Sequence, residues 1–403
     1  MVKITIGPPV KGDDLYDRED EIAEIWKKLQ DSSILLVAPR RFGKTSVMFH
    51  CRDHPQNGFK VFYLDIGYIS TPSDFMIELI RKLSDEGTVW RRLGTKIKNF
   101  FQLATDRLEE VDFVELKVKL RKSTEKTWRD LGNELIDILG NSDINILLIL
   151  DEFPVMIKNM IAYDKKEDKN DTRLLLQWLR HARISIETRN KIRFIIGGSI
   201  GIERLLDSIN EISSINDLEK VKIGEFSMEA ARNFIKDLFK SEGLEIDKNK
   251  CDTIMEVVGT PIPYFIQVLV SVTLKESNYK LENISPRLIL ETYYETMLGV
   301  DYKTYFQHYS SRLCEYYTQP NEVDTIKSIL TAIATKNEVA IKELYELYCE
   351  KMKQSEDKEG FSYLMAELEN DFYLRFNPKN QTYSFNSKVL QDWWKRYYGL
   401  LVP

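Results

Sequence analysis

The sequence predicts an α/β fold with a parallel sheet, followed by two smaller and mostly helical modules. Three apolar segments, at 34–37, 144–150 and 193–196, each end in a polar or glycine-containing turn, as buried parallel strands do. Segments with helical periodicity separate these strands, which favours strand–helix alternation. From about residue 226 the apolar spacing is helical almost throughout, so we expect the sheet to be confined to the first part of the chain.

The composition is that of a folded protein with more than one domain. A chain of 403 residues exceeds what one hydrophobic core usually serves, so two or three domains are expected. Hydrophobic residues make up 43% and charged residues 30%, which excludes a largely disordered chain. The net charge of −6 argues against a surface that is basic throughout, as a general binder of nucleic acid would need.

Membrane spans, disulfides and structural zinc are not expected. The longest apolar segments fall well short of the roughly 20 residues that a spanning helix needs, so no membrane partner is predicted. The four cysteines are scattered without a CxxC pair, and none lies at metal-ligand spacing from a histidine. These features predict a protein of the reducing cytoplasm.

The first elements alternate between helix and strand. Residues 14–30 carry apolar residues at helical spacing, with Asp17 as the expected N-cap. The first apolar strand then leads into a loop, and a helix is expected from about Lys44. A second strand at 60–65 and a helix around 75–83 complete a strand–helix–strand–helix series, which is typical of a parallel α/β core.

The chain is expected to form three domains. Near the C-terminus a series of helices is followed by two short strands around 377–380 and by a final helix from about Lys388. Helices followed by a hairpin are typical of a winged helix. The expected division is a core at 1–225 with a basic helical insertion at about 87–130, a helical lid at 226–285, and a winged-helix domain at 286–403.

The loop after the first strand has the pattern of a phosphate-binding loop. Residues 38–45 match Gly-x-x-x-x-Gly-Lys-[Ser/Thr] except that alanine replaces the first glycine, and they lie between a strand and a helix as the motif requires. Gly43 lets the backbone approach a phosphate, Lys44 reaches the β- and γ-oxygens as a catalytic residue, and Thr45 offers a hydroxyl to Mg²⁺. The expected nucleotide contacts of this P-loop are Arg40, Arg41, Phe42, Gly43, Lys44, Thr45 and Ser46.

An acidic pair follows the strand expected at 144–150. Asp151 and Glu152 come directly after Leu150, at the carboxyl end where open parallel sheets bind their ligands. In this interpretation Asp151 holds Mg²⁺, and Glu152 acts as the general base that deprotonates the attacking water. The alternative is an ordinary Asp-Glu pair that enters a solvated loop. The P-loop and the pair together favour the catalytic interpretation and predict an ATPase.

A further strand at 193–196 ends in two glycines and Ser199. A polar residue at this position would lie beside the γ-phosphate, so Ser199 is a candidate catalytic residue. The alternative is a glycine-rich turn with a capping serine. An arginine that acts on a neighbouring molecule's nucleotide is also conceivable, but the sequence does not choose among Arg180, Arg183, Arg189 and Arg204.

Taken together, these motifs resemble the AAA+-related STAND ATPases, in particular the archaeal-type branch with a Gly-Pro-Arg-Arg-x-Gly-Lys-Thr loop. Residues 38–46 are similar to that loop, and residues 15–21 to the family's Φ-Φ-Gly-Arg-x-x-Glu motif, with Asp17 in place of its glycine. Residues 259–261 look like the Gly-x-Pro of the lid, and residues 385–397 resemble the end of the winged helix. The resemblance extends over essentially the whole chain.

The resemblance implies a nucleotide-driven switch. Its cofactors would be ATP or ADP with Mg²⁺, its activity a slow ATP hydrolysis, and Arg18 and Pro261 would add nucleotide contacts. The nucleotide state of such proteins controls conformation and assembly. The partner would be another protein or a further copy of the chain, and the sequence identifies neither.

DNA binding is an alternative that the sequence does not favour. Residues 90–129 contain eleven Lys or Arg against six Asp or Glu, so this stretch is the better candidate for phosphate contacts. The candidate recognition helix at 356–371 contains six acidic residues and one lysine, a charge that phosphates would repel. A DNA-binding ATPase similar to replication initiators or transposition regulators therefore remains the second hypothesis.

Overall fold

The computed structural model divides into two compact units. One unit comprises Arg18–Ile223, and the other comprises Met1–Asp17 together with Gly224–Pro403. The chain therefore passes between the units twice. The expected basic insertion lies mostly outside the described part of the chain. The structure describes residues 3–10, 12–84, 125–141, 144–185, 188, 191–198, 201–317, 320–354 and 356–399.

The unit Arg18–Ile223 is built on a five-stranded sheet in the order β2-β3-β4-β1-β5. All neighbouring strands are parallel, which confirms the predicted α/β fold. The strand β5, with one buried residue at Val221, was not predicted, because an edge strand of this composition lacks an apolar run. The strands are β1 (Ile34–Val37), β2 (Phe59–Asp65), β3 (Asn145–Asp151), β4 (Ile192–Gly198) and β5 (Glu219–Lys222).

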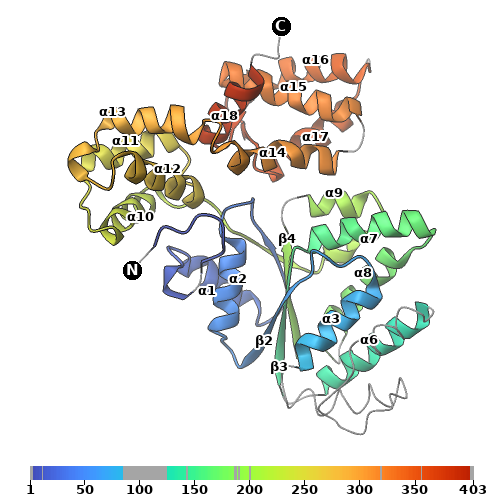
Figure 1. Cartoon of the computed structure of the whole chain (residues 1–403). Helices are drawn as coiled ribbons and strands as arrows, with labels where there is room; N and C mark the ends of the chain where they lie inside the picture. The colour runs from blue at the N-terminus through green and yellow to red at the C-terminus, as the bar shows by residue number, and fades with distance from the viewer. Residues whose placement is uncertain are drawn as a thin grey trace. The chain divides into compact units, whose positions relative to one another are not determined.

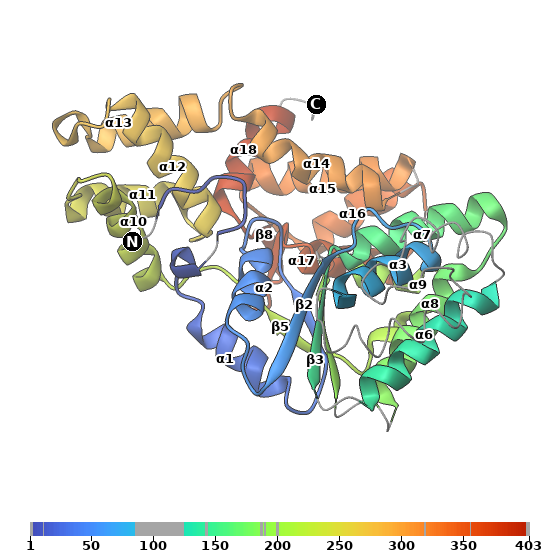
Figure 2. The same ribbon diagram turned by 60° about the horizontal axis from the view of Figure 1, so that its bottom comes forward.

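Helices cover both faces of this sheet. Helices α1 and α2 lie on one face, and α3, α6, α7 and α8 lie on the other (Figures 1 and 2). The first helix begins later than the sequence predicted: Asp17 has a left-handed φ of 49°, and Arg18 rather than Asp17 is the N-cap. The helices are α1 (Glu19–Lys28), α2 (Lys44–Asp53), α3 (Pro72–Ser84), α6 (Glu125–Gly140), α7 (Phe153–Glu167), α8 (Asp171–Ile184) and α9 (Ile202–Asp207).

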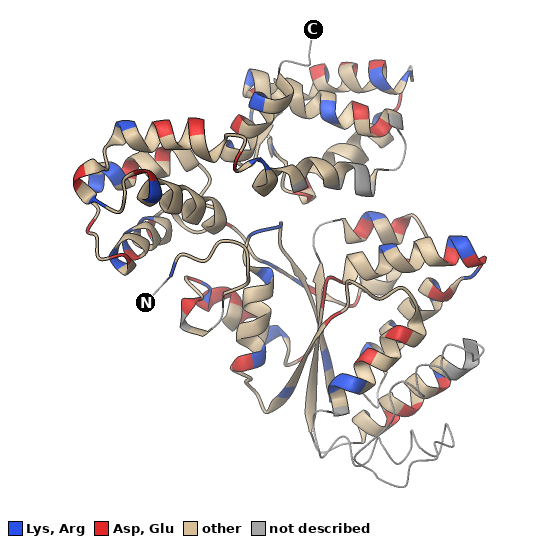
Figure 3. Ribbon diagram, viewed as in Figure 1, with Lys and Arg blue, Asp and Glu red and all other residues tan. Residues whose placement is uncertain are grey.

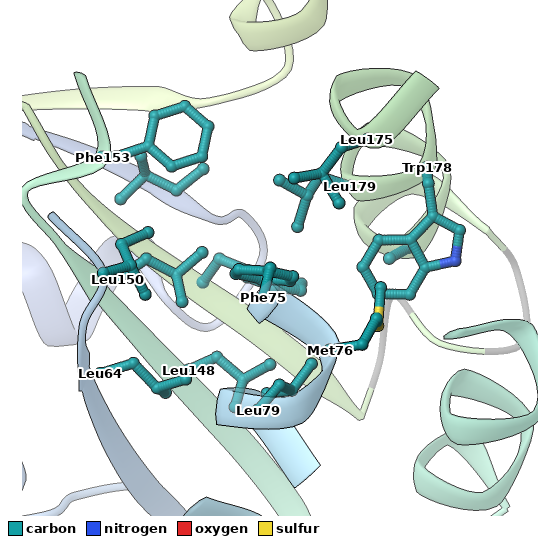
Figure 4. Packing of buried hydrophobic residues seen from close by; sticks show 14 of the residues in the cluster. Leu64, Phe75, Met76, Leu79, Leu148, Leu150, Phe153, Leu175, Trp178 and Leu179 are labelled. Atoms are coloured by element: carbon teal, nitrogen blue, oxygen red, sulfur yellow. The ribbon is translucent and has the colours of Figure 1, made fainter. Parts of the chain in front are cut away.

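The hydrophobic core of this unit lies between the sheet and α3, α6, α7 and α8. Leu148 and Leu150 of β3 face Phe75 of α3 in Figure 4. Trp178 of α8 packs so closely on α6 that a Cβ added at Gly132 would lie 2.8 Å from its ring. These contacts fix the sheet, and thereby the carboxyl ends of its strands.

The second unit is helical, with a small antiparallel sheet in the order β6-β8-β7. Its division into a lid and a winged helix stays a prediction. The strand β6 lies at the start of residues 337–352, for which the apolar spacing of the sequence predicts a helix. The elements are α10 (Met228–Ser241), α11 (Lys248–Val258), α12 (Pro263–Glu276), α13 (Pro286–Glu291), a π-helical turn (Thr292–Met297), α14 (Lys303–Tyr316), α15 (Pro320–Lys336), β6 (Glu338–Ala340), α16 (Ile341–Met352), α17 (Lys358–Asn370), β7 (Leu374–Asn377), β8 (Thr382–Phe385) and α18 (Lys388–Tyr398).

The N-terminal segment belongs to the second unit through specific contacts. The N–H of Thr5 donates to Oε1 of Gln267 at 2.7 Å, and the hydroxyl of Tyr16 donates to Oδ2 of Asp237 at 3.0 Å. The ring of Tyr16 also lies 4.9 Å from that of Phe234. Thr5 and Tyr16, which the sequence assigned to the core, therefore pack with the helical unit.

No helix in the described ranges of the chain combines the length and the apolar composition that crossing a bilayer requires.

Candidate functional site

The P-loop connects β1 to α2 and has the backbone of a phosphate cradle. Arg41 and Gly43 both have left-handed conformations, with φ of 72° and 90°. Left-handed residues within a turn can direct neighbouring N–H groups into a concavity that binds anions. The φ of Ala38 is not positive, so alanine at the first glycine position causes no backbone strain.

Arg18 is buried against the P-loop. Its guanidinium donates to the carbonyl oxygen of Phe42 at 3.4 Å and pairs with Oε1 of Glu21 at 2.6 Å. The side chain is 4% exposed, so Arg18 braces the loop from within the unit. Its predicted contact with the nucleotide stays a prediction.

Three predicted site residues meet at the end of β3. Lys44 Nζ forms an ion pair with Oδ1 of Asp151, and the hydroxyl of Thr45 donates to Oδ2 of the same carboxylate at 2.8 Å. Lys44 is 8% exposed and Asp151 is 2% exposed. The P-loop and the acidic strand end, far apart in sequence, therefore form one buried polar cluster.

Asp151 is held in its ionised form. Burial opposes the charge, but the Lys44 charge, the hydrogen bonds from Lys44 and Thr45, and the backbone N–H of Glu152 together lower the pKa of Asp151 below its usual value. The N–H of Glu152 donates to Oδ1 at 2.9 Å. An ionised carboxylate accepts hydrogen bonds or binds a cation, so Asp151 is ready for either.

Tyr63 of β2 is a partner of Asp151 that the sequence analysis missed. Its hydroxyl donates to Oδ2 of Asp151 at 3.1 Å. Burial and the Asp151 charge raise the pKa of Tyr63, so the phenol keeps its proton. The pairing of β2 with β3, in which Asp65 lies opposite Asp151, brings this tyrosine near the strand end, and no local feature of the sequence marks it.

Glu152 occupies a strained position directly after the strand. Its φ is 59°, a left-handed conformation that non-glycine residues adopt rarely, and it serves as the N-cap residue of α7. Its Cβ lies close to Gly67, where an added Cβ would be only 3.1 Å away. The chain therefore leaves the sheet directly after Asp151 and enters α7.

Gly197, near the end of β4, lies beside the polar cluster and was not among the predicted site residues. A Cβ at this position would overlap the terminal methyl of Met48, and would lie 2.9 Å from Oδ1 of Asp151 and 3.0 Å from Nζ of Lys44. Only glycine leaves room for the ion pair here. The paired glycines at the strand end were the sequence signal for this close approach.

The remaining predicted residues have varied outcomes. Ser199 and Arg189 lie outside the described residues. Arg183 is buried and bonded to Asp217 at 2.7 and 2.9 Å, so it holds its own unit together and is wrong as a finger candidate. Pro261 belongs to the other unit, where its carbonyl accepts the N–H of Phe226.

The donor set suits a nucleotide with a magnesium ion. The Thr45 hydroxyl and the Asp151 carboxylate are oxygen ligands, which Mg²⁺ prefers, and they lie together at the P-loop. Lys44 and the N-terminus of α2 supply the positive charge that phosphates require. The residues present therefore fit both groups.

This combination of a parallel sheet, a P-loop and an acidic strand end defines the architecture of a P-loop ATPase. The sequence matches no family model and no curated protein. The structure is similar to that of a Walker-type ATPase of Pyrococcus abyssi, with a TM-score of 0.62, 17% identity, and coverage of 97% of this chain and 99% of that one.

A second similar structure is the ORC2 protein of Aeropyrum pernix, described as ADPNP–ADP complexes. Its TM-score is 0.51 at 12% identity, with coverage of 97% of this chain and 96% of that one. At these identities the likeness shows the fold. The chain shares the fold of these two structures over nearly its whole length.

Proposed function

We propose that the protein binds and slowly hydrolyses ATP with Mg²⁺ and acts as a nucleotide-dependent switch of the STAND/AAA+ type. The observation that carries this proposal is the convergence of Lys44, Thr45 and Asp151 in one buried cluster. The cluster lies beside a P-loop in which Arg41 and Gly43 have left-handed backbone conformations. Structures with the same fold include one described with ADPNP and ADP, which supports a nucleotide as the ligand. The scattered free thiols, such as buried Cys51 and Cys251, suit a reducing cytoplasm.

Each residue of the cluster has a role in this proposal. Lys44 binds the β- and γ-phosphate oxygens, and the backbone of residues 40–46 surrounds them. Thr45 and Asp151 hold Mg²⁺, which supplies charge neutralisation on the phosphates. Glu152 orients a water molecule and removes its proton. Ser199 contacts the γ-phosphate, and Arg18 and Pro261 contact the nucleoside.

The switch part of the proposal rests on the division of the chain into two units. A nucleotide bound to Arg18–Ile223 can control the second unit through the two chain crossings, and thereby assembly with a protein partner or with further copies. The test is light scattering after size exclusion, with ADP and then with a non-hydrolysable ATP analogue. We expect the two nucleotides to give different masses or hydrodynamic radii. Identical profiles for a protein that binds both nucleotides would refute the switch.

DNA binding is the second candidate function, because the C-terminal helices and the antiparallel sheet β6-β8-β7 suit a winged helix. The charge does not favour it: α17 contains one lysine and three glutamates, and acidic and basic residues are interspersed over the helices (Figure 3). Fluorescence anisotropy with random duplex at several salt concentrations is the test. We expect no sub-micromolar binding at physiological salt. Tight binding that weakens steeply with salt would make this function the first choice.

A further inference from the structure

Tyr63 lies on β2, an edge strand of the sheet, and contacts the carboxylate at the end of the neighbouring strand β3. It is half-buried in β2, and its hydroxyl reaches Oδ2 of Asp151 at 3.1 Å. Its ring lies edge-on to Phe49 of α2 with the centroids 4.9 Å apart. The guanidinium of Arg52, also on α2, lies 4.5 Å from the ring of Phe49 and 6.0 Å from that of Tyr63. The ring is therefore held by the helix that follows the P-loop.

The four donors to Asp151 divide evenly between its two oxygens. Oδ1 accepts from Lys44 and from the N–H of Glu152, while Oδ2 accepts from Thr45 and Tyr63. In the proposed function, Lys44 turns to the phosphates and Thr45 becomes a metal ligand. The bond from Tyr63 serves neither the phosphate nor the metal, so it is the side-chain contact on Asp151 that nucleotide binding leaves in place.

We propose that Tyr63 is a positioning residue that orients the Asp151 carboxylate for the divalent cation. This inference rests on the proposed function. A carboxylate on a terminal rotatable bond needs a fixed donor to present one oxygen to a metal, and such outer partners of metal ligands typically change metal affinity about 10- to 100-fold. Ring packing against Phe49 of α2 fixes the direction of the phenol, so that its hydroxyl and that of Thr45 donate to the same oxygen of Asp151.

The substitution Tyr63→Phe isolates the hydroxyl, because it keeps the ring that Phe49 and Arg52 contact. Mn²⁺ serves as the probe, and its binding to the protein–ADP complex is measured by electron paramagnetic resonance. We expect the dissociation constant for Mn²⁺ to rise by roughly 10-fold or more. The affinity for ADP in the presence of EDTA should stay at the parent value, since Tyr63 does not contact the P-loop lysine.

Turnover gives a second readout. The Mg²⁺ concentration for half-maximal ATP hydrolysis should rise in Tyr63→Phe, while turnover at saturating Mg²⁺ returns towards that of the parent. The matched control is Tyr163→Phe, because Tyr163 lies on α7 in the same unit with Lys169 over its ring, away from Asp151. It should behave like the parent in both assays.

The outcomes separate this inference from the proposed function. A parent protein that binds neither ADP nor Mn²⁺ contradicts the function itself. A parent that binds both, with Tyr63→Phe binding Mn²⁺ equally well, overturns the role of Tyr63 alone. If Tyr63→Phe loses metal-free ADP affinity in the same proportion as Mn²⁺ affinity, or is not rescued by Mg²⁺, its role is structural and the inference is equally wrong.

Discussion

Two glycines, one in each unit, are both required by close contacts, yet their surroundings differ. Gly197 borders the Lys44–Asp151 pair, whereas a Cβ at Gly259 would lie 2.8 Å from Cβ of Lys388 at the start of α18. The next residue, Thr260, donates its hydroxyl to the carbonyl of Asn386 at 2.5 Å. Both segments look like nucleotide motifs in the sequence.

The difference shows how a polar site that can bind a ligand is distinguished from a packing contact between segments of one unit. Around Gly197, one lysine and two hydroxyl groups donate to the same buried carboxylate, that of Asp151. Around Gly259 and Thr260, the polar groups of the segment are used to attach α11 to the chain that leads into α18. The predictions below test whether this contrast holds, beginning with the largest effect.

Glu152→Gln should lower ATP turnover by roughly 10²-fold or more, because the amide cannot take the proton of the attacking water. ATP should still bind, since Glu152 is expected to contact the water rather than the phosphates. Phosphate release and equilibrium binding of ATP measure the two effects. Glu167→Gln, at the exposed end of α7, is the control. Parent-like turnover in Glu152→Gln would assign the base to another residue.

Lys44→Ala should weaken ATP and ADP binding by about 10- to 100-fold, because a hydrogen bond to a charged group contributes about 1.5–3 kcal/mol. Isothermal titration with each nucleotide measures this. The change also leaves Asp151 without its charge partner, so thermal unfolding is recorded on the same samples. Lys27→Ala, on the exposed face of α1, provides the comparison. Unchanged affinity in a folded Lys44→Ala protein contradicts the site.

Gly197→Ala should destabilise the unit Arg18–Ile223 by about 1–3 kcal/mol, because the new methyl overlaps Met48 and crowds the ion pair. Nucleotide affinity should fall with it. The adjacent Gly198 offers a matched control, because a Cβ there meets its nearest atom at an ordinary 3.7 Å. Denaturant unfolding measures the stability of both variants. Equal stability would show that the space between Gly197 and Lys44 can accept a methyl group.

Thr260→Val should have the smallest effect, a loss of about 1 kcal/mol from the hydrogen bond to Asn386. Calorimetry should detect it as a lower melting temperature, with nucleotide affinity unchanged. Thr253→Val, whose hydroxyl bonds within α11, is the reference. A tenfold loss of nucleotide affinity without a stability change would break the contrast and make this segment a ligand contact.

The sequence predicts the parts of the site that lie at strand ends and misses those that depend on neighbouring strands. The apolar β1, β3 and β4 and the P-loop are visible in the sequence because burial and turn chemistry are local. Tyr63 resembles any half-buried strand residue, since its contact with Asp151 joins positions 88 apart. The edge strand β5 was also not predicted, because only Val221 among its residues is buried and the strand therefore has no apolar run.

The tripeptide Tyr16-Asp17-Arg18 has a mechanical consequence. Tyr16 is anchored in the helical unit and Arg18 beneath the P-loop, so one left-handed residue separates the two anchors. The chain crosses again at Ile223–Gly224. Asp17 and Gly224 therefore stand at the two places where the backbone leaves one unit for the other, so a change at either position acts on both units at once.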